Sequence, residues 1–166
     1  VQTCALPICA RAEAEQQRLQ ALAGGIPFVT PSIAVLAGLK AIGEPQRLGI
    51  LTPYWPPADA LIAEFFTACG FRVVATHGLQ AKGPISVAQF TPEQILAGFE
   101  RLAEGGDIEA FVHVGTNLPV SAMTALIEER LGRPMIGVNV ATYWLALRQA
   151  GIQDPLPGFG QLAERH

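Results

Sequence analysis

Hydrophobic and polar positions change period repeatedly along the chain, from helical spacing to short apolar runs and back. Residues 11–22 place Leu19 and Leu22 on one face among Glu and Gln, which predicts a surface helix ending at Gly24-Gly25. Short apolar runs between turn residues predict strands, because a strand buried on both faces needs no polar alternation. The predicted strands are 26–30, 47–52, 71–76, 110–114 and 134–138, and the other predicted helices are 32–42, 58–69, 91–104, 119–131 and 141–150.

Capping and turn residues support these boundaries. Thr91-Pro92-Glu93-Gln94 combines a Thr cap, a Pro in the first turn and an early acid, which together predict a helix start. Residues 77–90 show no clear period, and we expect a loop or partly irregular segment there. Strands that alternate with helices over short connections predict an α/β fold, a doubly wound parallel sheet flanked by helices.

The length fits one domain, or most of one plus part of another, and the composition excludes several classes of protein. Of the 166 residues, 50% are hydrophobic and 15% are charged, so the chain is not a disordered charged tail. The formal net charge is −3 and Lys and Arg do not cluster, which argues against a surface for nucleic acid or anionic membrane. The longest apolar stretches, such as 33–39, are too short to span a bilayer. We expect a soluble, cytoplasmic protein.

The first eight residues have a separate interpretation. Residues 1–8 match, codon by codon, the translation of part of a common short-read sequencing adapter, and no initiator Met is present. They also lack the charged and apolar regions of a secretory signal. We therefore interpret them as an adapter-derived scar and expect the natural reading frame to continue upstream. The three cysteines, Cys4, Cys9 and Cys69, have no paired spacing that indicates a zinc site or a disulfide framework.

Three loops follow predicted strands at the edge where open parallel sheets bind ligands: 52–54, 115–118 and 139–142. Backbone N–H groups at a helix start favour an anion such as a carboxylate, and a nearby hydroxyl adds a directional hydrogen bond. The sequence contains no GxGxxG, P-loop or GxSxG motif, so dinucleotide, nucleotide and serine-hydrolase sites lose their usual support. The candidate substrate-binding residues are Thr52, Pro53, Tyr54, Gly115, Thr116, Asn117 and Leu118.

The same loops carry a resemblance to a known family. The segments 51–54 (LTPY), 114–118 (VGTNL), 141–144 (ATYW) and 157–162 (PGFGQL) resemble the aspartate/glutamate racemase superfamily, in its branch of arylmalonate decarboxylase and maleate cis-trans isomerase. The resemblance runs from residue 10 to the C-terminus. It implies a flavodoxin-like fold with two similar α/β halves, an active site between them, a small carboxylate substrate and no metal or organic cofactor. It also implies a reactive Cys, which protonates an enediolate in the decarboxylase or adds to a double bond in the isomerase.

Two positions depart from the pattern of that family. The resemblance implies that racemases of the superfamily place one Cys from each half on opposite faces of the substrate. Gly115 stands where the second of these would fall, so racemisation by two thiols is not supported. Pro84 stands where the isomerases carry a carboxylate-binding Asn, which favours the decarboxylase-like branch. The first Cys is expected upstream, because Cys9 lies close to the predicted strand at 26–30 and no Thr/Ser run follows it.

The resemblance divides the chain into parts. Residues 9–43 are a remnant of the N-terminal half, 44–138 form the C-terminal half, and 139–166 are a helix and tail that return to the N-terminal half. The leading hypothesis is a fragment of a cofactor-independent decarboxylase or isomerase, inactive by itself, that acts on a small dicarboxylate. The alternative is a non-catalytic, flavodoxin-like domain that binds a carboxylate, since the visible half lacks a reactive thiol. The sequence leaves the oligomeric state open, a homo-oligomer included.

Several candidates also have an ordinary structural interpretation. His113 alternates with Phe111 on a predicted central strand, which is typical of a core histidine. Cys69 lies at a helix end among phenylalanines and is expected to be a small core residue. Asn139 is either a turn residue or a ligand donor. Packing or helix capping is an open alternative to substrate binding for Thr52, Tyr54, Thr116 and Asn117.

Overall fold

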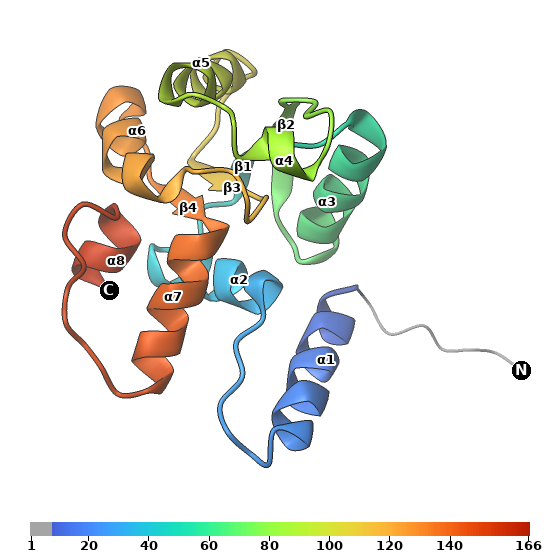
Figure 1. Cartoon of the computed structure of the whole chain (residues 1–166), viewed down its shortest axis with the longest axis vertical. Helices are drawn as coiled ribbons and strands as arrows, with labels where there is room; N and C mark the ends of the chain where they lie inside the picture. Colours follow the sequence, from blue (N-terminus) through green and yellow to red (C-terminus); the bar gives the residue numbers. More distant parts are fainter. Residues whose placement is uncertain (1–7) are drawn as a thin grey trace, which may run out of the picture.

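The computed structural model describes residues 8–166, so the expected adapter-derived segment lies outside the described residues apart from Ile8. Its centre is one parallel sheet of four strands in the order β2-β1-β3-β4 (Figure 1). This confirms the predicted parallel α/β fold. In a parallel sheet the carboxyl ends of all strands lie at one edge, so the loops after them are neighbours. The strands are β1 (Arg47–Thr52), β2 (Arg72–Gly78), β3 (Ala110–His113) and β4 (Met135–Gly137).

Helices cover both faces of the sheet. One face packs against α2, α3 and α7, and α2 and α7 lie side by side (Figure 1). The other face packs against α5 and α6. The helices are α1 (Ile8–Leu22), α2 (Pro31–Ala41), α3 (Pro56–Ala68), α4 (Pro84–Val87), α5 (Pro92–Ala103), α6 (Thr124–Leu131), α7 (Val138–Gln149) and α8 (Gln161–Arg165), with a 3-10 turn at Ser121–Met123.

The alternation of side chains along each strand divides the interior into two cores. Ile50 and Val112 belong to the core beneath α2 and α7, whereas Leu51 and Phe111 belong to the core beneath α5 and α6. All four side chains are fully buried. Burial of such a side chain is worth roughly 1.5–3 kcal/mol, so both cores hold the strand ends in a fixed arrangement.

The structure corrects the sequence-based assignment in several places. The predicted strand at 26–30 is wrong, because this segment runs as irregular backbone between α1 and α2. Its polar groups pair with α1 and not with the sheet: the N–H and the hydroxyl of Thr30 both donate to Gln16 Oε1 at 3.0 Å. Pro27 within the segment has no N–H to donate to a sheet.

Other predicted boundaries also move. The strand predicted at 134–138 ends at Gly137 because α7 begins at Val138, three residues before the predicted start. The helix predicted from 119 begins as a 3-10 turn and becomes α-helical at Thr124. The segment expected to be irregular, 77–90, contributes the end of β2 and the short helix α4. The helix start at Thr91 is confirmed, since Thr91 and Gln94 form a reciprocal capping box.

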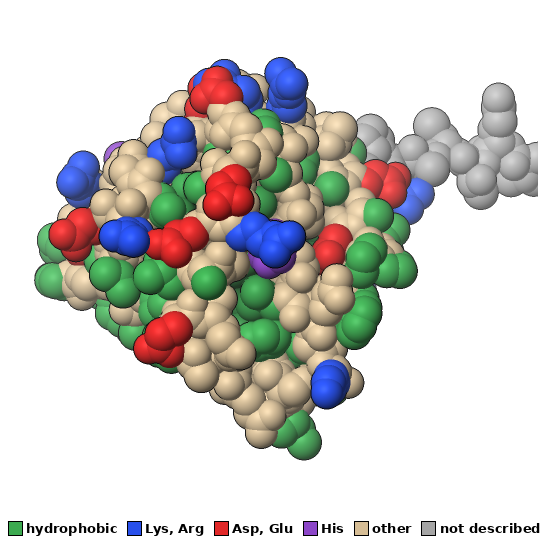
Figure 2. Space-filling view, turned by 90° about the horizontal axis from the view of Figure 1, so that it is seen from above, with side chains coloured by type: hydrophobic (Ala, Val, Ile, Leu, Met, Phe, Trp, Pro, Cys, Tyr) green, Lys and Arg blue, Asp and Glu red, His purple; other side chains and the backbone are tan. Residues whose placement is uncertain are grey.

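The surface carries both signs of charge. On the face shown in Figure 2, Lys and Arg side chains are interspersed with Asp and Glu. Two ion pairs among the described residues are Arg47 with Glu109 at 2.9 Å and Arg130 with Glu100 at 2.9 Å. Among residues 8–166, no helix has the length and apolar character needed to cross a membrane.

Candidate functional site

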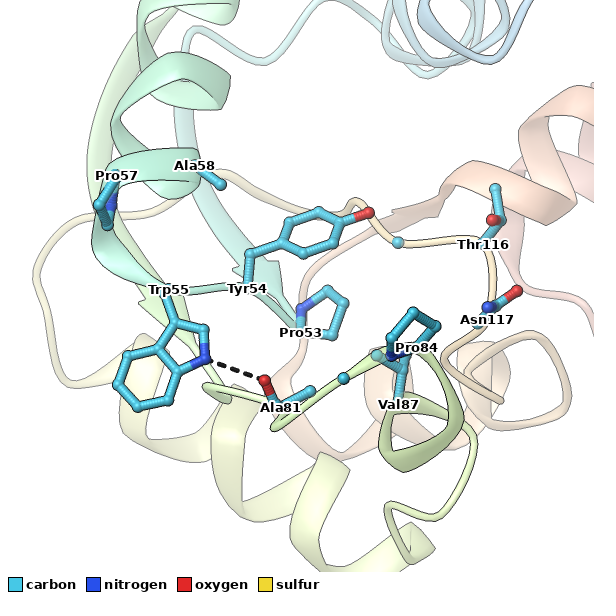
Figure 3. A pocket seen from close by; sticks show the side chains of 12 residues that line it. Pro53, Tyr54, Trp55, Pro57, Ala58, Ala81, Pro84, Val87, Thr116 and Asn117 are labelled. Atoms are coloured by element: carbon cyan, nitrogen blue, oxygen red, sulfur yellow. Dashed lines mark hydrogen bonds between the residues drawn. The ribbon is translucent and has the colours of Figure 1, made fainter.

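A cavity of about 510 Å³ lies at the carboxyl ends of β1 and β3 (Figure 3). Three segments form its walls: the loop after β1 with the start of α3, the segment after β2 with α4, and the loop after β3. These segments are far apart in sequence and meet because the parallel sheet aligns their strands. The lining residues are Pro53, Tyr54, Trp55, Pro57, Ala58, Ala81, Gly83, Pro84, Val87, Gly115, Thr116 and Asn117.

The structure brings five of the seven sequence candidates to this cavity and places two behind it. Pro53, Tyr54, Gly115, Thr116 and Asn117 line the cavity. The remaining candidates, Thr52 and Leu118, are 0% and 1% exposed and lie in the interior. Thr52 is the last residue of β1 and its hydroxyl turns toward Asp59, whereas Leu118 packs in the core beneath α5 and α6.

Tyr54 supplies the phenol of the site. Its ring points toward the loop that carries Thr116 and Asn117 (Figure 3). The residue is 38% exposed and lines the cavity, so it can meet a ligand there. A phenol donates one hydrogen bond, and a carboxylate oxygen is a strong acceptor for it.

The loop after β3 approaches the loop after β1 closely. Gly115 has a φ of +142°, in the region that favours glycine. A Cβ on this residue would lie 2.5 Å from Pro53 Cδ, which is closer than real side chains approach. The loop is closed by Leu118 N–H, which donates to Gly115 O at 3.1 Å. Asn139 Nδ2 donates to Thr116 O at 2.8 Å and ties the same loop to the start of α7.

The segment after β2 forms the apolar wall, and most of it was not among the sequence candidates. Ala81, Gly83, Pro84 and Val87 come from this segment and from α4. The indole N–H of Trp55 donates to Ala81 O at 2.9 Å and joins this wall to the start of α3 (Figure 3). The topology could have indicated this wall. Because β2 lies next to β1 in a parallel sheet, the segment after β2 leaves at the same edge as the loop after β1.

The polar groups of the cavity are neutral. Among the described residues that line it, no side chain carries a formal charge. His113 lies directly beneath: it is 1% exposed, and its Nε2 would be 3.6 Å from a Cβ on Gly115. Burial lowers the pKa of His113 to about 4, although a hydrogen bond with the Gly115 backbone opposes the shift. The imidazole is therefore uncharged near pH 7, as a core histidine is, and its Nε2 has no hydrogen-bond partner among the described residues.

The third candidate loop, 139–142, does not reach this cavity. Asn139 and Tyr143 line a separate hollow of about 220 Å³ with Phe159 of the tail. Trp144 packs in the core beneath α2. Residues 139–142 are helical and not a loop, because α7 begins at Val138, directly after β4, and β4 is one strand further from β1.

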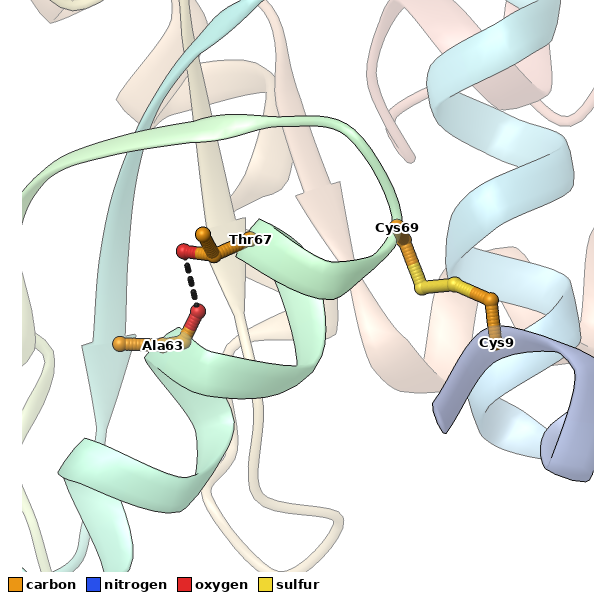
Figure 4. Close-up of a disulfide and its surroundings, with 4 residues drawn as sticks. All are labelled: Cys9, Ala63, Thr67 and Cys69. Atoms are coloured by element: carbon orange, nitrogen blue, oxygen red, sulfur yellow. Dashed lines mark hydrogen bonds between the residues drawn. A yellow bond between two sulfur atoms is a disulfide. The ribbon is translucent and has the colours of Figure 1, made fainter. Parts of the chain in front are cut away.

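The structure also corrects the interpretation of the cysteines. Cys9 of α1 and Cys69 at the end of α3 form a disulfide with a Cα–Cα distance of 5.4 Å (Figure 4). Cys69 is half-buried at the surface and is not a small core residue, and the expectation of no disulfide was wrong. No local sequence pattern indicated this disulfide, because the two cysteines are separated by 60 positions and meet only when α1 packs on α3. Neither sulfur lines the cavity.

Metal ligands do not gather in the described part of the chain. Within residues 8–166, no group of three or more His, Cys, Asp or Glu side chains is arranged to hold a metal ion.

Comparison with known proteins places this architecture in a family. The family model for arylmalonate decarboxylase matches residues 11–163. An arylmalonate decarboxylase from Bordetella bronchiseptica is 30% identical over 146 residues, which cover 84% of this chain and 59% of that protein. A maleate isomerase from Alcaligenes faecalis is 23% identical over 137 residues, which cover 82% of this chain and 54% of that protein. The chain thus spans little more than half the length of these relatives.

Solved structures agree with this assignment. A crystal structure of arylmalonate decarboxylase superposes with a TM-score of 0.85 and 26% identity, covering 93% of this chain and 68% of that one. A Nocardia farcinica maleate cis-trans isomerase with a covalently bound succinylcysteine intermediate superposes with a TM-score of 0.81 and 23% identity, covering 95% of this chain and 64% of that one. At 23% identity, the similarity to the isomerase structure shows a shared fold. The match over residues 11–163 shows that this chain belongs to the arylmalonate decarboxylase family, in the branch of the aspartate/glutamate racemase superfamily that its loops resemble.

Proposed function

We propose that this chain forms one side of the active site of a cofactor-independent decarboxylase or isomerase that acts on a small dicarboxylate. The observation that carries the proposal is the cavity in which the Tyr54 phenol faces the loop of Thr116 and Asn117. Hydroxyl, amide and backbone groups line this cavity at the carboxyl ends of β1 and β3, where they can hold one carboxylate of the substrate.

The reacting thiol in this proposal comes from a segment of the full-length protein upstream of this chain. The absence of a side chain at Gly115 supports that source, as does the pairing of Cys9 with Cys69 away from the cavity. In this proposal residues 9–43 belong with that upstream half, residues 44–138 form the second half, and 139–166 return to the first. The isolated chain would then bind substrate without converting it.

The composition of the cavity favours a substituted malonate over maleate. Trp55, Pro84 and Val87 give it an apolar wall that suits an aryl or alkyl substituent. Pro84 lies in that wall, where it offers no amide side chain to a second carboxylate. A carboxylate placed against such a wall loses its hydration, which favours its departure as neutral carbon dioxide.

The proposed chemistry follows from these groups. The bond from the α-carbon to the unsolvated carboxylate breaks, and its electron pair moves into the other carboxyl group to give an enediolate. Tyr54 and the backbone N–H groups of the 115–117 loop stabilise the charge that develops on its oxygens. The thiol then gives its proton to the α-carbon and regains one from water.

The test uses the full-length protein and the 166-residue chain side by side. Each is incubated with phenylmalonate and with maleate, and phenylacetate and fumarate are measured by NMR. We expect the full-length protein to form phenylacetate, an upstream Cys→Ala variant to lose that activity, and the 166-residue chain to form neither product. Unchanged activity in the Cys→Ala variant contradicts the proposed thiol.

A second candidate function is a domain that binds a carboxylate without catalysis. Gly115 favours it, because the described cavity wall contains no reactive thiol. Tight binding of phenylmalonate by the full-length protein, with no conversion of phenylmalonate or maleate, would select this alternative.

A further inference from the structure

A buried carboxylate lies behind the cavity wall, and the proposed chemistry does not use it. Asp59, in the first turn of α3, is 8% exposed and does not line the cavity. Removing a carboxylate from water is costly unless hydrogen bonds replace the lost solvent, although the N-terminal end of a helix reduces the cost. The partners of Asp59 therefore indicate its role.

Those partners lead to Tyr54. The Thr52 hydroxyl donates to Asp59 Oδ1, and the Tyr54 N–H donates to the same Thr52 hydroxyl at 3.0 Å. A hydroxyl has one proton, so its donation to Asp59 turns its lone pairs toward the Tyr54 N–H. Asp59 thereby fixes the direction in which Thr52 accepts.

The other side of the Tyr54 backbone is held by the segment after β2. Gln80 N–H donates to Tyr54 O at 3.1 Å, and Leu79 N–H donates to Thr52 O at 2.9 Å. Gly78 allows this close approach, since a Cβ there would lie 2.5 Å from Tyr54 O and would overlap Asp59 Oδ2. Both polar groups of the Tyr54 backbone are thus fixed, and Asp59 is the charged group of the network.

We propose that Asp59 is a positioning residue, which acts through the Thr52 hydroxyl to aim the Tyr54 phenol at the substrate carboxylate. This inference rests on the proposed function of the cavity. Because Tyr54 is 38% exposed, neighbouring side chains confine its ring only in part, and its backbone sets its direction. Asp59 itself does not touch the substrate.

The chain offers a direct measurement, because it contains two tyrosines, Tyr54 and Tyr143. Labelling with 3-fluorotyrosine gives two ¹⁹F resonances, and Tyr143→Phe assigns them. Phenylmalonate is titrated into the wild-type chain, Asp59→Ala and Asp59→Asn. Glu64→Ala is the matched control, since it removes an exposed carboxylate from the same helix.

We expect Asp59→Ala to broaden or split the Tyr54 resonance before ligand is added and to weaken phenylmalonate binding on the order of tenfold. Asp59→Asn keeps an oxygen acceptor for Thr52 and is expected to restore both readings to near wild type. An unchanged Tyr54 resonance and affinity in Asp59→Ala overturns the inference, as does an equal loss in Asp59→Asn. The Glu64→Ala variant is expected to match the wild type.

A second pair of variants tests the same network if Asp59→Ala does not fold. Thr52→Val removes the hydroxyl and keeps the shape, whereas Thr52→Ser keeps the hydroxyl. We expect only Thr52→Val to disturb the Tyr54 resonance, and equal spectra for the two variants overturn the inference. Failure of phenylmalonate to move the Tyr54 resonance of the wild-type chain contradicts the proposed function alone, because the resonance without ligand still reports on Asp59.

Discussion

Gly115 faces the ring of Pro53 so closely that a Cβ on residue 115 would lie 2.5 Å from Pro53 Cδ. This contact joins the loop after β3 to the loop after β1 and sets the floor of the cavity. This backbone therefore leaves no room for a cysteine at residue 115, where the resemblance to the superfamily predicts one.

The first prediction concerns that contact. Gly115→Ala is expected to destabilise the protein by about 1–3 kcal/mol, because it adds a clash with Pro53 to a backbone with φ of +142°. Urea unfolding measures the effect. Gly83→Ala is the control, since Gly83 has extended backbone and open space around it. A Gly115→Ala variant as stable as Gly83→Ala would show that the loops can separate without cost.

The second prediction concerns the phenol. Tyr54→Phe is expected to raise the dissociation constant for phenylmalonate by roughly tenfold, because one hydrogen bond to a carboxylate is lost. Calorimetric titration measures the constant. Tyr143→Phe is the matched control, since Tyr143 lines a different hollow and is 59% exposed. Equal affinities for the two variants would remove Tyr54 from the binding site.

The third prediction concerns pH. The pKa of the His113 imidazole is lowered from 6.5 to about 4 in the folded protein, so the unfolded state binds a proton first as the pH falls. His113 is therefore expected to cost stability progressively between pH 6.5 and about 4, on the order of 3 kcal/mol in total. Above pH 6.5 both states are neutral and this dependence disappears.

Urea unfolding of the wild type and of His113→Leu across this pH range isolates the effect of that imidazole. The difference in the free energy of unfolding between the two proteins is expected to change steeply below pH 6.5. His77→Gln is the control: burial also lowers the pKa of His77, but its side chain is only partly buried, so its removal changes the pH dependence less. If the free energies of unfolding of wild type and His113→Leu changed in parallel with pH, the buried imidazole would not have the lowered pKa.

The fourth prediction concerns the attachment of the C-terminal helix. Glu128 Oε1 accepts from Met135 N–H at 2.8 Å and Glu128 Oε2 accepts from Gln161 N–H at 2.7 Å, so this carboxylate joins α6, β4 and α8. Glu128→Gln keeps one acceptor and sets an amide N–H against the other donor. We expect a loss of about 1–3 kcal/mol and faster hydrogen exchange in α8. Glu129→Gln makes the same charge change on an exposed neighbour and should leave exchange unaltered.

The sequence determined the elements whose signals are local. The capping box at Thr91 and Gln94 marked the start of α5, because its two hydrogen bonds join residues three apart. Buried apolar runs marked β1 and β3, and their alternation with helices was sufficient to predict a parallel sheet. From that topology alone it followed that Tyr54 and Gly115 lie at the same edge.

Tertiary structure decided everything that depends on which segments meet. The apolar run at 26–30 had the composition of a strand, but Thr30 found its partner in Gln16 of α1. Cys9 and Cys69 gave no signal in sequence because their meeting depends on the packing of α1 on α3.

The cavity likewise combines parts that the sequence predicted with parts that only tertiary contacts decided. Its polar loops were predicted from strand ends, whereas Pro84 and Val87 became a wall because Trp55 holds Ala81 against the start of α3. Local hydrogen-bond and burial patterns fix secondary structure, and contacts between distant segments, which no local pattern encodes, fix the shape of the site.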